Sequence, residues 1–216
     1  MAVMNVNPTR MELTNLKRKL VTARRGHKLL KDKRDELMRQ FLELVRENKE
    51  LRVKVENGIA QVNEHISLAC SVMSEESLSV ALMMPPQKMS VEVLSKNIMS
   101  VNVPEYIPKF KTADKEDIYP YGFAFTSSDL DSAVKMLYDL VPDMLKLAQT
   151  EKTCQLLSAE IEKTRRRVNA LEHVMIPNYT DTIKYITMKL DENERSTTTR
   201  LMKIKDMMLQ NNQGII

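Results

Sequence analysis

A nearly uninterrupted heptad repeat of apolar residues runs through the first third of the chain. From Leu13 to Val72 the repeat positions alternate three and four residues apart, and no proline falls between Pro8 and Pro85. This period is typical of a helix that packs along a second helix in a left-handed coiled coil. Because a helix of about 70 residues is about 105 Å long, a small globular core cannot cover its seam. The sequence therefore predicts a long two-helix coiled coil.

The composition also favours long, solvent-exposed helices. Of the 216 residues, 29% are charged and 5% aromatic, and tryptophan is absent. A net charge of +4 does not by itself indicate a nucleic-acid partner. No run of about 18 apolar residues is present, so we expect no membrane insertion. Cys70 and Cys154 lie far apart without a CxxC motif, which argues against a disulfide framework or a zinc site.

The middle of the chain, residues 83–128, has a different character. It holds most of the prolines, and apolar residues alternate with polar ones over residues 90–93 and 100–103. Two such runs separated by a short polar stretch predict a β-hairpin. We expect Pro104 to end the second strand, and we allow for a third short strand over residues 119–126.

Three segments follow from these patterns: an N-terminal long helix over residues 1–82, a middle segment with the hairpin over 83–128, and a C-terminal long helix over 129–216. The fold class is mainly α, with the two helices forming one antiparallel coiled coil around a small β-hairpin insert. Pro142 marks a late helix start or a kink, and Pro177 is expected to kink or break the second helix.

The two apolar seams suggest how the helices face each other. If the chain folds back near residues 82 and 130, the numbers of facing residues sum to roughly 212 within one helical turn. Phe41 would then face Leu171, Leu44 would face Val168, and His27 would face Tyr185. His27 and His65 occupy seam positions, and we interpret them as polar residues that fix the register rather than as ligands or pH sensors. The expected seam comprises Leu30, Leu37, Phe41, Leu44, Leu51, Ile161, Val168, Leu171, Ile186 and Leu190.

The sequence carries no signature of catalysis. It has no phosphate-binding GxxxxGK[ST] loop, no GxGxxG and no GxSxG motif. Its three histidines have no partners at metal-ligand spacing. We therefore expect a non-enzymatic chain with no catalytic, cofactor-binding or metal-binding residues and no cofactor.

Two basic stretches raise the question of nucleic acid, Lys17–Arg34 and Arg165–Arg167. Acidic residues lie beside both, as at Asp32 and Glu162, and no aromatic residues are interleaved for base stacking. This pattern favours a solvated or protein-facing surface over a nucleic-acid groove. We call the densest cations the basic collar: Lys17, Arg18, Lys19, Arg24, Arg25 and Lys28.

Long blocks of the sequence resemble a known family. NPTRMELTNLKRKLVTARRGHKLLKDKRDELMRQF, over Asn7–Phe41, is similar to the opening of the D subunit of the vacuolar and archaeal-type (V-type/A-type) rotary ATPases. EKTCQLLSAEIEKTRRRVNALEHVMIP and ENERSTTTRLMKIK, within Glu151–Lys205, resemble its second helix, and KNIMSVNVP at Lys96–Pro104 resembles its middle segment. The short length resembles bacterial or archaeal members.

The resemblance implies a central rotor shaft in a V-type ATPase. Such a shaft stands inside a ring of catalytic A and nucleotide-binding B subunits, with the F subunit beside the coiled coil and a funnel-like subunit (C or d) at its base. It couples ATP hydrolysis or synthesis to proton or sodium transport, and it would lie on the cytoplasmic side of the cell membrane as a peripheral part of the complex. The basic collar would face the ring. Two alternatives remain open from the residues: a coiled-coil scaffold or tether, and an RNA-binding helical hairpin.

Overall fold

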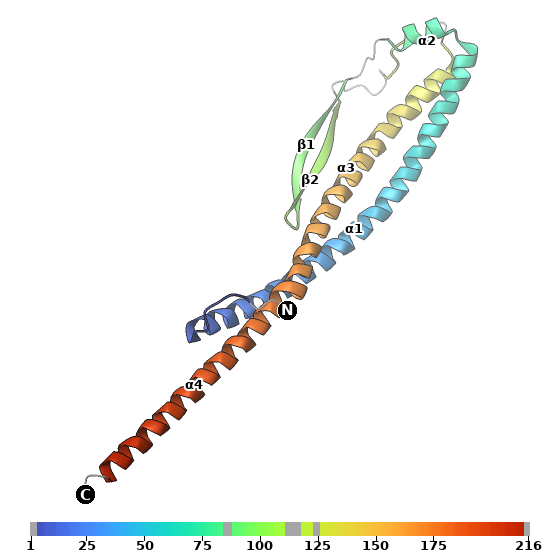
Figure 1. Cartoon of the computed structure of the whole chain (residues 1–216). Helices are drawn as coiled ribbons and strands as arrows, with labels where there is room; N and C mark the ends of the chain where they lie inside the picture. Colours follow the sequence, from blue (N-terminus) through green and yellow to red (C-terminus); the bar gives the residue numbers. More distant parts are fainter. Residues whose placement is uncertain (1–3, 84–87, 111–117, 123–125, 214–216) are drawn as a thin grey trace. The chain divides into compact units, whose positions relative to one another are not determined.

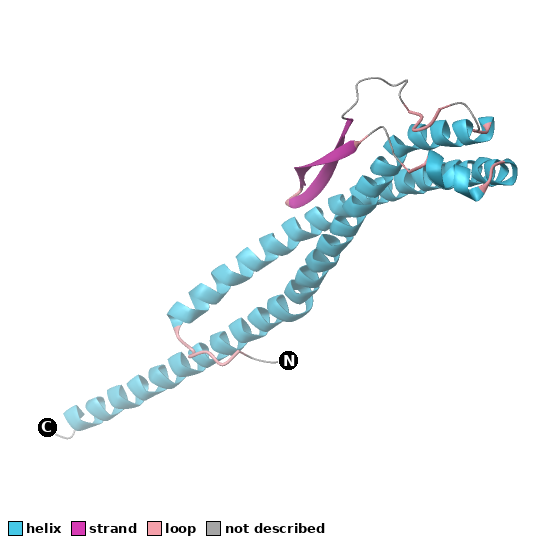
Figure 2. Cartoon of the chain, turned by 90° about the horizontal axis from the view of Figure 1, so that it is seen from above, coloured by secondary structure: helices cyan, strands magenta, loops and turns pink. Residues whose placement is uncertain are grey.

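Most of the chain is described by a computed structural model, which covers residues 4–83, 88–110, 118–122 and 126–213. Helices form nearly all of it, with a single pair of strands among the described residues (Figure 2).

The described residues form five helical elements, which follow one another along the chain (Figure 1). They are α1 (Arg10–Val72), α2 (Glu75–Ala81), α3 (Ser128–Ala170), η1 (Leu171–Met175) and α4 (Ile176–Gln213). The first long helix begins where the sequence indicates. Thr9 directly precedes it, and its Oγ1 accepts a hydrogen bond from the Glu12 N–H at 3.3 Å, which satisfies one otherwise unpaired donor of the first turn.

The chain divides into two compact units. Unit 1 comprises residues 1–35 and 162–216, and unit 2 comprises residues 36–161. In each unit, a segment of α1 lies against a segment of the later helices, which run in the opposite direction. The antiparallel two-helix arrangement expected from the heptad repeat is therefore confirmed within each unit.

The register of the two helices differs from the predicted one. In unit 2, a methyl group added at Gly58 would lie 2.7 Å from Leu140 Cδ1, whereas a sum of 212 would place Gly58 opposite Cys154. The Lys54 ammonium likewise pairs with the Asp143 carboxylate at 2.7 Å. The predicted partners of Phe41 and Leu44, which were Leu171 and Val168, are also wrong. Both side chains pack instead against a core that contains Leu157 and Ile161 of α3.

Unit 1 shows the same displacement. His27 Nε2 lies 3.3 Å from Glu172 Oε2, where the predicted partner was Tyr185. The cause lies at the turn between the helices. α1 ends at Val72, and the Ser74 hydroxyl accepts from the Ser77 N–H at 3.3 Å to cap the separate helix α2. The first arm of the hairpin is thus about ten residues shorter than predicted, and every facing position shifts toward the start of α3.

Neither proline of the second arm ends the helical structure. Pro142 lies inside α3, which starts at Ser128. Pro177 is the second residue of α4, and α4 directly follows the π-helical turn η1. Of the kink or break expected at Pro177, the break does not occur. Because proline has no N–H, one carbonyl of the preceding turn loses its partner, and the backbone passes through a wider turn without ending the helix.

The β-hairpin is longer than predicted. β1 (Met89–Ile98) pairs antiparallel with β2 (Val101–Phe110). Pro104 does not end the second strand, because the ribbon has only two strands and the N–H that proline lacks would have pointed away from β1. No third strand occurs in the described part of the expected segment, at residues 119–122 and 126; residues 123–125 lie outside the described residues.

Two apolar clusters hold unit 2 together. One joins the turn end of the hairpin to both long helices and consists of Leu37, Val101, Val103, Leu157 and Ile161. The other lies where α1, α2 and α3 meet and consists of Ala69, Ala81 and Leu130. The hairpin is therefore fixed to the helices near its turn, while every residue of β1 before Ile98 is exposed.

Candidate functional site

No group of three or more His, Cys, Asp or Glu side chains among the described residues is placed to bind a metal ion. No helix in the described ranges combines the length and apolar content that a membrane crossing requires.

The ten expected seam residues all lie at least half-buried. Leu37, Ile161, Val168 and Ile186 are buried. The others are half-buried: Leu30, Phe41, Leu44, Leu51, Leu171 and Leu190.

Four buried seam residues escaped the sequence analysis because they are threonines: Thr150, Thr153, Thr164 and Thr182. Their hydroxyls can turn back onto the helix, as when Thr153 Oγ1 donates to the Gln149 carbonyl at 2.7 Å. A count of apolar residues alone misses them, although their heptad spacing was visible.

Thr182 has a second role within unit 1. Its hydroxyl accepts a hydrogen bond from the Met4 N–H at 3.2 Å and donates to the Asn178 carbonyl at 2.6 Å. This contact ties the segment before α1 to α4.

The basic collar lies on the outside of unit 1. All six side chains are exposed, and none forms an ion pair with a described residue. At about 100° per residue, Lys17, Arg24 and Lys28 fall on one line of α1. Arg18 and Arg25 both lie about 80–100° to one side of this line, and only Lys19 points the opposite way. The collar is thus a positive face whose charges are not neutralised by described parts of the chain.

The end of α4 exposes an unusual number of apolar side chains. Arg10, the first residue of α1, pairs with Glu194, and every residue of α4 from Asp191 to Leu209 is exposed. No described residue of α1 covers Leu201, Ile204 or Met208, which continue the helix beyond the seam residue Leu190. We call this surface the terminal apolar patch: Leu201, Met202, Ile204, Met207, Met208 and Leu209.

A cavity of about 600 Å³ lies between α2 and the segment before α3. Tyr121 lines it and donates a hydrogen bond to Asp131 Oδ1 at 2.8 Å. Partial burial and the neighbouring Asp131 carboxylate raise the pKa of the Tyr121 hydroxyl above its ordinary value, so this tyrosine stays protonated and neutral. The hydrogen bond ties the segment before α3 to the first turn of that helix, and the Tyr121 hydroxyl does not act as a nucleophile near neutral pH.

Comparison with known proteins identifies the family. Residues 12–206 match the family described as the ATP synthase D subunit. The chain is 63% identical over 212 residues to the V-type ATP synthase D subunit of Acetivibrio thermocellus, covering 97% of this chain and 95% of the relative. It is 62% identical to that of Clostridioides difficile, covering 97% and 94%, and 56% identical to that of Clostridium botulinum, covering 99% of both. With near-complete coverage at these identities, the chain belongs to the ATP synthase D subunit family.

Proposed function

We propose that this chain is the central rotor shaft of a V-type rotary ATPase, where it couples ATP hydrolysis or synthesis in a catalytic ring to proton or sodium transport. The observation that carries the proposal is the family match over residues 12–206 together with two long antiparallel helices in each unit. A shaft must transmit torque, and two helices packed along a common seam resist twisting better than one helix.

The proposed role requires no chemistry from the chain itself. Hydrolysis belongs to the ring subunits, and the shaft acts by favouring different conformations at ring sites that are otherwise equal. A single two-helix hairpin has no threefold symmetry, so it contacts each site of a threefold ring differently. A population shift at each site then follows from differential contact energy.

The proposed partners of unit 1 are the catalytic A and nucleotide-binding B subunits. The basic collar supplies unneutralised positive charge, which suits exchangeable contacts with acidic loops of the ring because exposed ion pairs are weak and screened. The terminal apolar patch supplies surface that the described parts of this chain leave uncovered. Exposed apolar side chains gathered on one segment are typical of a protein-interaction site.

Two further partners complete the proposal. The F subunit docks beside the coiled coil, and a funnel-like subunit (C or d) binds at the base. This chain lies on the cytoplasmic side of the cell membrane, as a peripheral part of a membrane-bound complex.

The test is co-purification followed by variants of the collar. Native mass measurement should find one copy of the chain in each ring-shaped ATPase head. Replacing Arg18, Arg24, Arg25 and Lys28 with Gln should weaken assembly and flatten its dependence on salt. The matched control replaces four exposed cations of unit 2 with Gln: Arg46, Lys49, Lys135 and Lys146.

Three outcomes would contradict parts of the proposal. A chain that never co-purifies with an ATPase head is not a shaft. A collar variant that behaves like its control makes the collar a solvated face. RNA binding that weakens steeply with salt would instead support the RNA-binding alternative.

A further inference from the structure

The outer edge of β1 carries a row of unpaired backbone groups. The hairpin closes at the Ile98–Val101 pair through a two-residue turn, so hydrogen-bonded and non-hydrogen-bonded pairs alternate from there. By this alternation, Val91, Val93 and Ser95 lie in non-hydrogen-bonded pairs. Their N–H and C=O groups point away from β2, and no described residue pairs with them. Unpaired edges of this kind are templates for another strand.

The outer edge of β2, in contrast, is closed. Pro104 and Pro108 have no N–H, and both lie at positions whose N–H would point outward. Between them, the Tyr106 N–H donates to Gln149 Oε1 of α3 at 3.1 Å. β2 is accordingly the strand nearer α3, and β1 is the outer one (Figure 1). The sequence protects one edge of the ribbon and leaves the other open.

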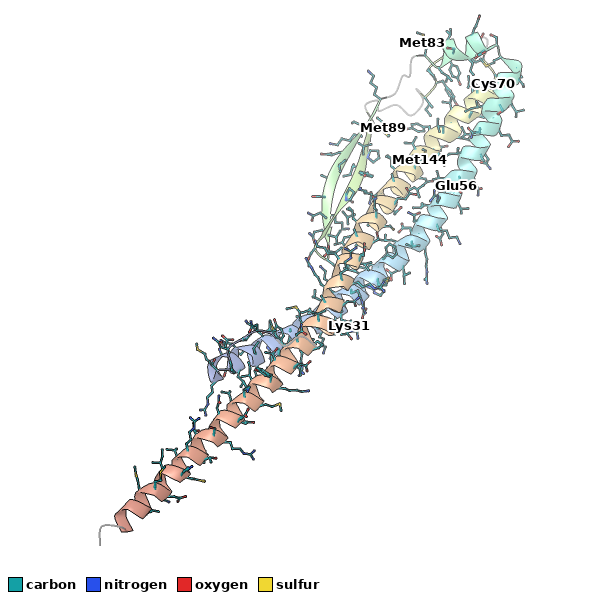
Figure 3. The ribbon with its side chains drawn as sticks, in the orientation of Figure 1. Lys31, Glu56, Cys70, Met83, Met89 and Met144 are labelled. Carbon is teal, nitrogen blue, oxygen red and sulfur yellow. The ribbon has the colours of Figure 1, made fainter. Side chains whose placement is uncertain are left out.

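The side chains of β1 are also largely exposed. On one face Met89, Val91 and Val93 are 41%, 38% and 62% exposed, with Met89 at the open end of the hairpin (Figure 3). On the other face Glu92 pairs with Lys109, while the exposed Lys96 has no partner among the described residues. Among the residues of β1 alone, the charge left without an ion pair is therefore positive.

We propose that an extended segment of another subunit of the rotary complex adds to the outer edge of β1 as a third strand. Its chemistry follows from the edge: apolar side chains alternate with others, the apolar ones covering Val91 and Val93, and at least one acidic side chain meets Lys96. This inference rests on the proposed function, because a central shaft is present once in each complex and a second copy of the chain cannot then supply the strand.

Hydrogen exchange resolved to single amides tests the proposal. The free chain and the purified complex that contains it are compared. The N–H groups of Val91, Val93 and Ser95 should exchange at least about 100-fold more slowly in the complex, because only an added strand pairs with them. Those of Glu92, Leu94 and Lys96 already face β2 and should change far less. Unchanged exchange at all three odd positions would overturn the proposal.

A proline variant tests the same edge by a second route. Val93→Pro removes one outward N–H without touching a β1–β2 hydrogen bond, whereas Val93→Thr keeps the N–H and the branched shape. When each variant competes with the unmodified chain for incorporation into the complex, the proline variant should lose by about tenfold and the threonine variant by less than about threefold. Incorporation of the proline variant equal to that of the unmodified chain would overturn the proposal.

Further outcomes distinguish failure of the added strand from failure of the proposed shaft function. Failure of the unmodified chain to enter an ATPase complex defeats the proposed function. Entry without the alternating protection defeats only the added strand. Alternating protection that appears in the free chain and grows with its concentration shows that a second copy fills the edge, which also overturns the proposal.

Discussion

At the scale of single residues, two glycines in α1 differ in what surrounds them. A methyl group at Gly26 would meet nothing within 4 Å, whereas one at Gly58 would lie 2.7 Å from Leu140 Cδ1 and 3.3 Å from its Cδ2. Both glycines cost helix stability relative to alanine. Only at Gly58 is this cost offset by packing, because the absence of a side chain leaves room for the buried Leu140.

Alanine substitution should separate the two glycines. Gly26→Ala should raise the free energy of unfolding by about 1 kcal/mol, the difference in helix propensity. Gly58→Ala should leave the free energy of unfolding unchanged or lower it. Displacing Leu140 costs at least as much free energy as the better helix propensity of alanine contributes. Denaturant titration of the two variants measures the difference, and equal stabilisation would show that Leu140 moves aside freely.

The two cysteines should react with alkylating agents at different rates. Burial, assisted by the carboxylates of Glu151 and Glu47, raises the pKa of the Cys154 thiol, so less thiolate is present at any pH below that value. Cys70 is exposed, near the end of α1 (Figure 3). Timed alkylation at pH 8 with peptide mass analysis should label Cys70 first, and the Cys154 rate should keep rising above pH 9. Equal rates would argue against the burial of Cys154.

At the scale of elements, the register of α1 against α3 is the decisive feature of unit 2. It can be tested with disulfides in a Cys70→Ser background. Gly58→Cys with Leu140→Cys should cross-link under mild oxidation, because these positions face each other. Gly58→Cys alone should not form a disulfide with the native Cys154. Position 58 faces position 140, and Cys154 lies about 21 Å farther along α3. Non-reducing electrophoresis distinguishes the two, and the opposite result would restore the register expected from the sequence.

The hairpin turn holds two non-glycine residues in the left-handed region. Met99 has φ 49° and Ser100 has φ 73°, as a type I′ turn requires. Met99 packs against the nearby core, but the exposed Ser100 does not. Ser100→Gly should therefore stabilise the hairpin by about 0.5–1 kcal/mol.

Slower exchange of the Lys96 and Val103 amides, which face each other across the ribbon, would measure this gain. Ser95→Gly, inside the strand, is the control and should have the opposite effect.

At the scale of the whole molecule, the proposed shaft works only if both helices stay intact along their length. Leu44→Pro should cost about 3 kcal/mol or more locally and interrupt α1 in unit 2. The ring would keep hydrolysing ATP, but ion transport should fall much further than hydrolysis. The ratio of ions pumped to ATP hydrolysed in reconstituted vesicles is the measurement, with Leu42→Ala, at an exposed position of the same helix, as control. A normal ratio with a demonstrably broken helix would contradict the shaft.

The sequence by itself determined the class of fold and much of the core. A heptad period is a local property, so Leu37 and Val168 could be placed in a seam without knowing their partners. The same holds for the hairpin, since its alternation is local. Long matching blocks identified the family for the same reason, because they need no knowledge of contacts.

Only the tertiary structure decided the register and what it leaves uncovered. A heptad seam repeats itself, so sliding one helix by seven or fourteen residues still apposes apolar positions, and the predicted register erred by two such repeats. The turn breaks this degeneracy: α1 stops at Val72 and Ser74 caps a new helix. With the turn fixed, the end of α4 has no covering helix among the described residues, and the outer edge of β1 has no covering strand.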